Sequence, residues 1–193
     1  RAACSGTDRM IHLIDPVAGK VLRPLPLETS ILALAFTPGG KLLVLGGGFL
    51  RLWQIGPDAA GDEEVWKLRI PTRPGQRGTV GVSPDGKSVA ASASLVLIVA
   101  DAQTGMEQFR IDRSHIEDTG FQVAAFSPDS RRLITGSGGT AGAVQVWDMT
   151  TRALVRRYST GLGGVTRLTV FPDGSRVASA GADEAITIWD LSK

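Results

Sequence analysis

Asparagine is absent from the 193-residue chain, and cysteine and histidine are nearly so. The single cysteine, Cys4, excludes an internal disulfide framework and every metal module that needs several thiolates. The two histidines offer no metal-ligand spacing. The longest apolar run, around 94–100, falls short of the roughly 18 residues needed to cross a bilayer. We therefore expect no cofactor, no metal and no membrane span, and a cytoplasmic protein.

An excess of charge of one sign is also missing. The chain has 21 basic and 19 acidic residues, and the acids are interspersed among the arginines along its whole length. A nucleic-acid-binding protein needs its positive charge gathered on one face. We therefore expect no nucleic-acid partner, and we interpret the arginine bias as a coding bias of a GC-rich genome.

What the chain does contain is an internal repeat. Four segments share an apolar run followed by x-Pro and a small or acidic residue, and their prolines lie 46, 44 and 44 residues apart. These prolines are Pro38, Pro84, Pro128 and Pro172. A second marker recurs out of phase with the first, at 13–15, 52–54, 99–101, 146–148 and 188–190. Two markers with one period of about 44 residues indicate a repeat architecture.

Each period divides into short segments with the pattern of β-strands, because none shows a sustained 3.6-residue periodicity. The first segments end in a Pro-Asp-Gly-type turn and are predicted at 31–36, 79–82, 121–126 and 165–170. The second segments are predicted at 42–45, 88–93, 133–137 and 176–179. The third segments end at the second marker, and more polar fourth segments follow at 65–70, 106–111 and 154–158.

Four antiparallel strands in about 44 residues is the unit of a β-propeller blade. The segments 136–150 and 179–191, with Trp147-Asp148 and Trp189-Asp190, resemble WD-repeat (β-transducin repeat) propellers, and the resemblance covers essentially the whole chain. It implies an all-β propeller with blades at about 1–28, 29–72, 76–112, 118–160 and 163–193. We expect an open arc holding about four and a half of seven blades. Its first blade lacks the innermost strand and its last lacks the outermost.

The resemblance also assigns structural roles. In this family a hydrogen-bond chain joins a His, a Ser or Thr, an Asp and the Trp of one blade. Ser179 and Asp183 match the pattern before Trp189, and Ser137 matches it before Trp147, but no blade holds the full set. We therefore expect apolar packing to carry more of the stability than this network. The residues assigned to the repeat are Asp8, Asp15, Trp53, Ser137, Trp147, Asp148, Ser179, Asp183, Trp189 and Asp190.

Two further residues have structural interpretations. Cys4 lies in a second strand, where we expect a small buried apolar side chain and not a reactive thiol. His12 aligns with Arg51, Gln145 and Thr187 at a polar third-strand position that we expect to be exposed.

Catalytic interpretations find little support. The glycines and serine at 136–139 lead into a strand, so they form neither a nucleophile elbow nor a phosphate-binding loop before a helix. The predicted inner strands carry few acids, which disfavours a propeller-type metal-dependent hydrolase or lyase. We expect no enzyme activity and no catalytic residues.

The resemblance implies a scaffold that binds partner proteins through the turns at one face of the propeller. The residues predicted at that face are Arg9, Phe49, Arg77, Ser94, Phe121 and Glu184. Phe49 follows three glycines and is a candidate interface anchor, although it could equally pack against the next blade. A basic stretch with Lys67 and Arg69 could contact phosphates, but an outer strand with a solvated face explains it as well.

The resemblance leaves one alternative open. Bacterial WD-repeat propellers are frequently the sensor or docking portion of longer chains, sometimes after a serine/threonine kinase domain. We expect such a fragment to carry no kinase signature itself, and none is present.

Overall fold

The computed structural model describes residues 2–27, 29–71, 78–93, 96–112, 120–139, 142–161 and 163–191. Within these ranges the chain forms eighteen β-strands in five antiparallel sheets, with one short 3-10 helix and no α-helix. The all-β propeller fold with incomplete blades is therefore confirmed. The strands predicted in the first, second and fourth positions match the observed ones to within two residues at either end.

The strands follow one another in chain order within every sheet. The first sheet has β1 (Ala2–Ser5), β2 (Met10–Asp15) and β3 (Lys20–Pro26). The second has β4 (Ile31–Phe36), β5 (Leu42–Gly46), β6 (Phe49–Gln54) and β7 (Glu63–Arg69), with the 3-10 helix η1 (Ala59–Gly61) between β6 and β7.

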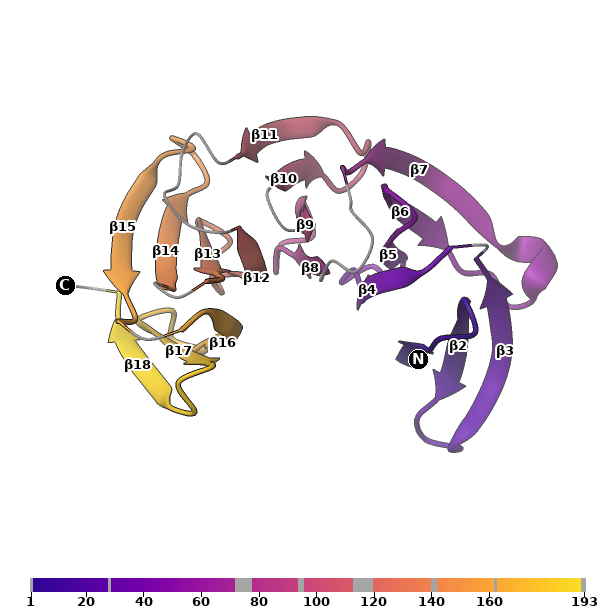
Figure 1. Cartoon of the computed structure of the whole chain (residues 1–193). Coiled ribbons are helices and arrows are strands. Elements are labelled where there is room, and N and C mark those ends of the chain that lie inside the picture. Colours follow the sequence, from indigo (N-terminus) through magenta and orange to yellow (C-terminus); the bar gives the residue numbers. More distant parts are fainter. Residues whose placement is uncertain are drawn as a thin grey trace.

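The third sheet has β8 (Gly78–Val82), β9 (Ser88–Ala93), β10 (Val96–Asp101) and β11 (Glu107–Ile111). The fourth has β12 (Phe121–Phe126), β13 (Arg132–Ser137), β14 (Ala143–Asp148) and β15 (Leu154–Ser159). The fifth has β16 (Val165–Val170), β17 (Arg176–Gly181) and β18 (Ile186–Asp190). The sheets stand side by side in an arc, with β4, β8, β12 and β16 along its inner side (Figure 1).

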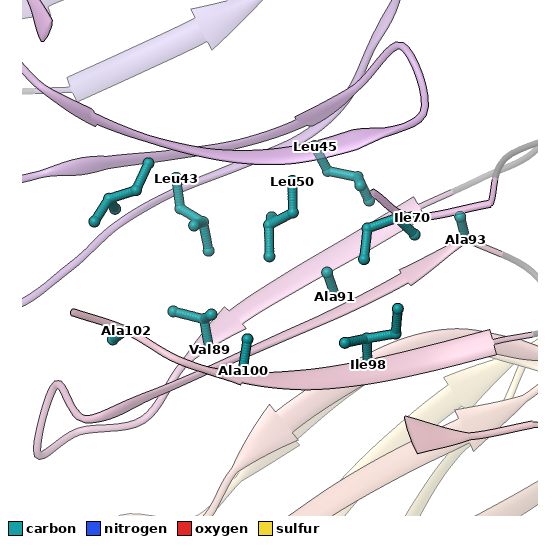
Figure 2. Packing of buried hydrophobic residues seen from close by; sticks show 11 residues of the cluster. Leu43, Leu45, Leu50, Ile70, Val89, Ala91, Ala93, Ile98, Ala100 and Ala102 are labelled. Atoms are coloured by element: carbon teal, nitrogen blue, oxygen red, sulfur yellow. The ribbon is translucent and has the colours of Figure 1, made fainter. Parts of the chain in front are cut away.

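The core lies between neighbouring sheets. All five residues of β5 are buried because both faces of this strand are covered. Leu42 and Val44 pack toward the first sheet, whereas Leu43 and Leu45 point the other way. Figure 2 shows Leu43, Leu45 and Leu50 facing Ala91 and other small residues of the third sheet. Alternation along each strand therefore builds one apolar layer per pair of sheets.

The proline turns are fixed by polar side chains in the third and fourth sheets. The Ser127 hydroxyl donates to Asp129 Oδ1 at 2.5 Å and accepts from the Arg132 amide at 2.9 Å. Ser83 and Asp85 repeat this pattern at 2.6 Å. The hydrogen bond from the serine is the main reason that the pKa of each carboxyl lies below its ordinary value. The acids of these turns are thus structural.

The aspartate of the second marker closes the turn between the third and fourth strands. Asp148 Oδ1 accepts from the amides of Thr150 and Thr151 at 2.9 and 2.7 Å. Asp15 and Asp101 accept from the equivalent amides, and these backbone hydrogen bonds lower the pKa of both carboxyls. Each of these three aspartates is therefore the turn-forming carboxylate at the end of its third strand.

The tryptophans of the last two sheets each meet a hydroxyl of the second strand. Trp189 Nε1 donates to Ser179 Oγ at 2.8 Å, and Trp147 Nε1 donates to Thr135 Oγ1 at 3.0 Å. The hydroxyl that meets Trp147 is thus Thr135 and not Ser137, which accepts from the Ala143 amide instead. Asp183 contacts neither group; its Oδ1 accepts from the Ala185 amide at 3.4 Å.

Two sequence expectations about burial are wrong. Cys4 is exposed, because it pairs with His12 on the face of the first sheet opposite to Ile11 and Leu13, which pack on the second sheet. Gln145 is fully buried, although we expected its third-strand position to be exposed. It lies between two sheets and accepts from Thr135 Oγ1 at 3.3 Å.

Tyr158 joins the fourth sheet to the fifth. Its hydroxyl donates to the Asp190 carbonyl at 2.7 Å, and its ring centroid lies 5.4 Å from that of Trp189. A polar handle on a large apolar ring suits such a position at the outer side of an interface.

Candidate functional site

Three of the predicted partner-binding residues lie at equivalent turns. Arg9 follows β1, Phe49 follows β5 and Glu184 follows β17, and each turn precedes the third-position strand of its sheet. Because the sheets stand in the same orientation along the arc, these turns face the same edge, which we call the rim. Arg9 and Glu184 adopt positive φ angles of 61° and 56° and are exposed. The rim therefore presents side chains of both charges.

Phe49 is the aromatic residue of this edge. Gly47 and Gly48 precede it at φ angles of 59° and 81°, which L side chains rarely adopt. This tight turn places Phe49 at the first position of β6, opposite Arg69 of β7. Its ring is half-buried, and it lines a hollow of about 410 Å³ together with Arg69, Ile70 and Pro71.

Basic side chains surround the Phe49 ring. The Arg51 guanidinium carbon lies 5.4 Å and the Lys67 ammonium 5.9 Å from the ring centroid, within range of a cation–π interaction. Arg51 also forms an ion pair with Glu64 at 3.4 Å. We call Phe49, Arg51, Lys67 and Arg69 the basic rim patch. It holds three cations and one neighbouring carboxylate, so its local field is positive.

The other predicted partner-binding residues do not join this patch. Phe121 is only 2% exposed and packs between the third and fourth sheets, so it is a core residue and not a surface anchor. It begins β12, where the side chain turns inward. Arg77 and Ser94 lie outside the described residues.

Asp8 and His12 form a local pair beside the first rim turn. Asp8 Oδ2 lies 2.6 Å from His12 Nε2, and Asp8 Oδ1 accepts from the Met10 amide at 3.2 Å. The hydrogen bond with His12 is the main reason that the pKa of Asp8 is lowered. Both groups are partly exposed, and the pair fixes the turn that presents Arg9.

No metal-type arrangement is found in the part of the chain that the structure describes: no three His, Cys, Asp or Glu side chains there cluster suitably. Over the same ranges, no helix is long and apolar enough to cross a membrane.

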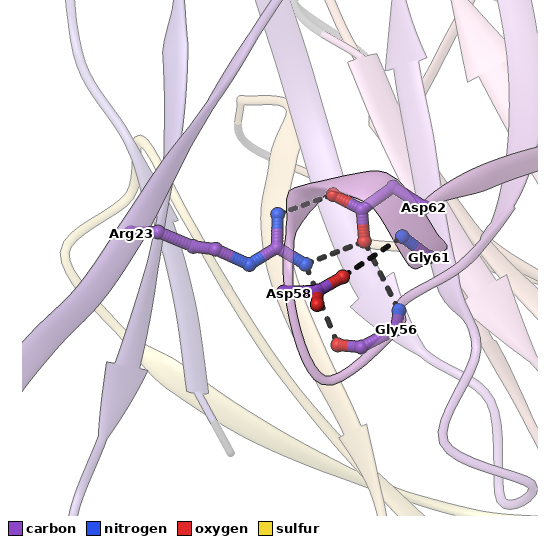
Figure 3. A network of polar contacts seen from close by, with 5 residues as sticks. All are labelled: Arg23, Gly56, Asp58, Gly61 and Asp62. Carbon is purple, nitrogen blue, oxygen red and sulfur yellow. Dashed lines mark hydrogen bonds and ion pairs between the residues drawn. The ribbon is translucent and has the colours of Figure 1, made fainter.

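Sequence reasoning missed one polar cluster. Arg23 of β3 forms an ion pair with Asp62, which follows η1 in the second sheet (Figure 3). The hydrogen bond with Asp62 is the main reason that the pKa of Arg23 is raised. The two residues are 39 positions apart, and Asp62 lies in a connection that has no equivalent in the other repeats that the structure describes, so no local signal marks them.

The comparisons with known proteins agree with this geometry. The family model for the WD domain, G-beta repeat, matches residues 113–148 and 153–190. Those two ranges include the two tryptophans that bond to a second-strand hydroxyl.

Similar proteins cover nearly the whole chain. It is 28% identical to Pre-mRNA-processing factor 19 of Oryza sativa subsp. japonica over 99% of its length and 36% of that protein. It is 31% identical to Actin-interacting protein 1-2 of Arabidopsis thaliana over 90% of its length and 28% of that protein. It is 28% identical to an uncharacterized WD repeat-containing protein of Synechocystis over 76% of its length and 40% of that protein.

The chain thus spans well under half the length of each of these relatives. The matched repeat units, the four-stranded sheets and the Trp-Asp markers agree with one another, and the chain belongs to the WD-repeat family of β-propeller proteins.

Proposed function

We propose that this chain is a non-catalytic scaffold that holds a partner protein on its rim, with Phe49 as the principal anchor. The observation that carries the proposal is the half-buried Phe49 ring, which lines a hollow of about 410 Å³ and has two cations over it. Aromatic residues in partly closed pockets dominate protein interfaces. Relatives named for pre-mRNA processing and for interaction with actin support a scaffold role in general.

The charge around Phe49 defines the chemistry of the partner. Lys67 and Arg69 form no ion pair with an acidic residue in the described part of the chain, and Arg51 forms one with a single glutamate. An acidic segment that carries an apolar side chain would meet both the cations and the hollow. RNA fits less well, because the cations lie over the ring that a base would stack on.

The test is capture of partners from a lysate of the native host, followed by their identification. Phe49→Ala should reduce recovery of the specific partner by at least about tenfold, the effect of losing one interface anchor. Lys67→Glu should also reduce recovery of the partner, because it introduces a charge that repels an acidic segment. This reduction should grow as the salt concentration is lowered.

The matched control is Phe109→Ala. Phe109 is also half-buried and has an arginine, Arg152, 6.0 Å from its ring centroid, but it lies on β11, away from the rim. Equal loss of the partner from Phe109→Ala, or full capture by Phe49→Ala with an unchanged melting temperature, would overturn the rim assignment.

A further inference from the structure

A second surface lies at the outer perimeter of the arc, between β3 and the connection that holds η1. It is a groove of about 280 Å³ whose lining is mostly apolar. Ile11, Leu25 and Trp53 form its lining together with Pro24 and Ala59. We call it the perimeter groove. It is separate from the basic rim patch, because the two share no lining residue.

The wall of the groove is held in place by polar contacts across two sheets. Figure 3 shows the Arg23 guanidinium against the Asp62 carboxylate. Asp62 Oδ1 also accepts from the Gly56 amide at 3.0 Å, and Asp58 Oδ1 accepts from the Gly61 amide at 3.1 Å. The Arg23 and Asp62 side chains are only 17% and 7% exposed. The groove is therefore preformed, and its central ion pair belongs to the wall.

The main chain of β3 is poorly suited to pairing with a further strand. Leu27 donates its amide to the Arg9 carbonyl at 3.1 Å, inside the sheet. Since amides alternate in direction along a strand, Pro24 and Pro26 stand where outward-facing donors would be. Proline has no amide hydrogen to offer. A strand added at this edge would find no donor at these two positions, so side-chain contacts must supply much of the binding of a ligand there.

The wall of the groove carries one excess negative charge. Asp58 is exposed and lies close enough to Arg23, a lining residue, to interact with it electrostatically. Asp62 is neutralised by its direct ion pair with Arg23, so the Asp58 carboxylate is left in excess. An apolar groove beside this carboxylate is complementary to an apolar side chain next to a cation.

We propose that the perimeter groove binds an extended segment of a partner protein that inserts one large aliphatic or aromatic side chain, with a Lys or Arg beside it over Asp58. The preformed wall limits the ordering cost on the scaffold side. This site is independent of the basic rim patch and prefers the opposite charge in its ligand.

The test is selection of a random linear peptide library displayed on phage against the whole chain. The enriched peptides should share a large apolar residue with Lys or Arg within about three positions. Ala59→Trp, which fills the mouth from an exposed turn, should weaken a selected peptide at least about tenfold. Asp58→Asn should weaken it severalfold and reduce its salt dependence. The amide oxygen introduced at position 58 can still accept from the Gly61 amide, so the turn is retained.

Two controls separate this proposal from the rim. Glu107→Gln removes one carboxylate from the outer strand β11 and should leave peptide affinity unchanged. Phe49→Ala should also leave peptide affinity unchanged. The experiments can therefore refute the groove proposal without refuting the rim proposal, and the reverse.

Several outcomes would overturn the proposal. These are a selection without a shared motif, enriched peptides that are acidic, and peptides that bind Ala59→Trp with undiminished affinity. Sedimentation that shows a dimer of the wild-type chain and a monomer of Ala59→Trp would assign the groove to a second copy instead. Melting temperatures of all variants establish that the fold is intact.

Discussion

The second and fourth sheets have a tryptophan at the same position, but among the described residues its indole N–H has a hydrogen-bond acceptor only in the fourth sheet. Trp147 pairs across the sheet with Leu133, and Trp53 pairs with Leu42. Two residues further along the second strand, the fourth sheet has Thr135. The second sheet has Val44 there, so Trp53 Nε1 is buried without a hydrogen-bond partner among the described residues.

The difference shows that the repeat preserves apolar shape more strictly than polar pairing. Both sheets have the same strand order and equivalent inter-sheet packing. An unpaired buried donor destabilises a protein by about 1–3 kcal/mol, and the burial of several leucines can offset that cost. The second sheet is thus held mainly by packing, whereas the fourth adds a polar contact.

The largest expected effect tests the packing side of this comparison. Leu43→Ala should destabilise the chain by about 2–5 kcal/mol, because Leu43 is fully buried between the second and third sheets and leaves a cavity. Denaturant unfolding measures the change. Val155→Ala, at a side chain 58% exposed, is the control and should change stability by less than about 0.5 kcal/mol. Similar costs for the two variants would refute the packing interpretation.

The next effect tests the polar side. Thr135→Val should destabilise the chain by about 1–3 kcal/mol, because it leaves Trp147 Nε1 and Gln145 Oε1 without this hydroxyl in a fully buried place. The same unfolding measurement applies. In a Trp147→Phe background the substitution should cost less, and an unchanged cost there would show that the indole contact is not responsible.

The reciprocal change should stabilise the second sheet. Val44→Thr offers Trp53 Nε1 an acceptor in the position that Thr135 occupies relative to Trp147, with an expected gain of about 0.5–1.5 kcal/mol. Unfolding of this variant is compared with that of Val44→Thr in a Trp53→Phe background, where the gain should vanish. A net loss in the first variant would mean that burial of the hydroxyl outweighs its hydrogen bond.

The smallest effect concerns the proline turns and pH. The lowered pKa of Asp129 means that its ionised form stabilises the folded state above pH about 4, and that this contribution is lost as pH falls through the folded-state value. Asp129→Asn should therefore make the melting temperature less sensitive to acid below pH about 4. The second sheet has Gly39 at that place, so Thr37→Ala should leave the acid response unchanged.

Much of the fold followed from local pattern. The 44-residue period, the proline turns and the Trp-Asp markers predicted the strands because each signal acts over a few neighbouring residues. The repeat also predicted Ser179 as the partner of Trp189. Counting back from Trp147 selected Ser137 and missed Thr135, because the connection between β13 and β14 is longer than that between β17 and β18.

The candidate sites were less accessible to such reasoning. Phe121 looked like a rim residue but begins a strand whose side chain enters the core. Cys4 looked buried but lies on the uncovered face of the first sheet. In both places burial depends on which sheet lies opposite, and a single strand's pattern does not contain that information.

The sequence by itself determined the all-β repeat, the strand order and the family, because turn chemistry and alternation are local properties that recur with the period. Only the tertiary structure showed that cations gather around the Phe49 ring and that the perimeter groove exists. Those features join residues of different strands, and Arg23 meets Asp62 across two sheets because the arc brings β3 and η1 together. Binding surfaces here arise from that packing and not from any single repeat.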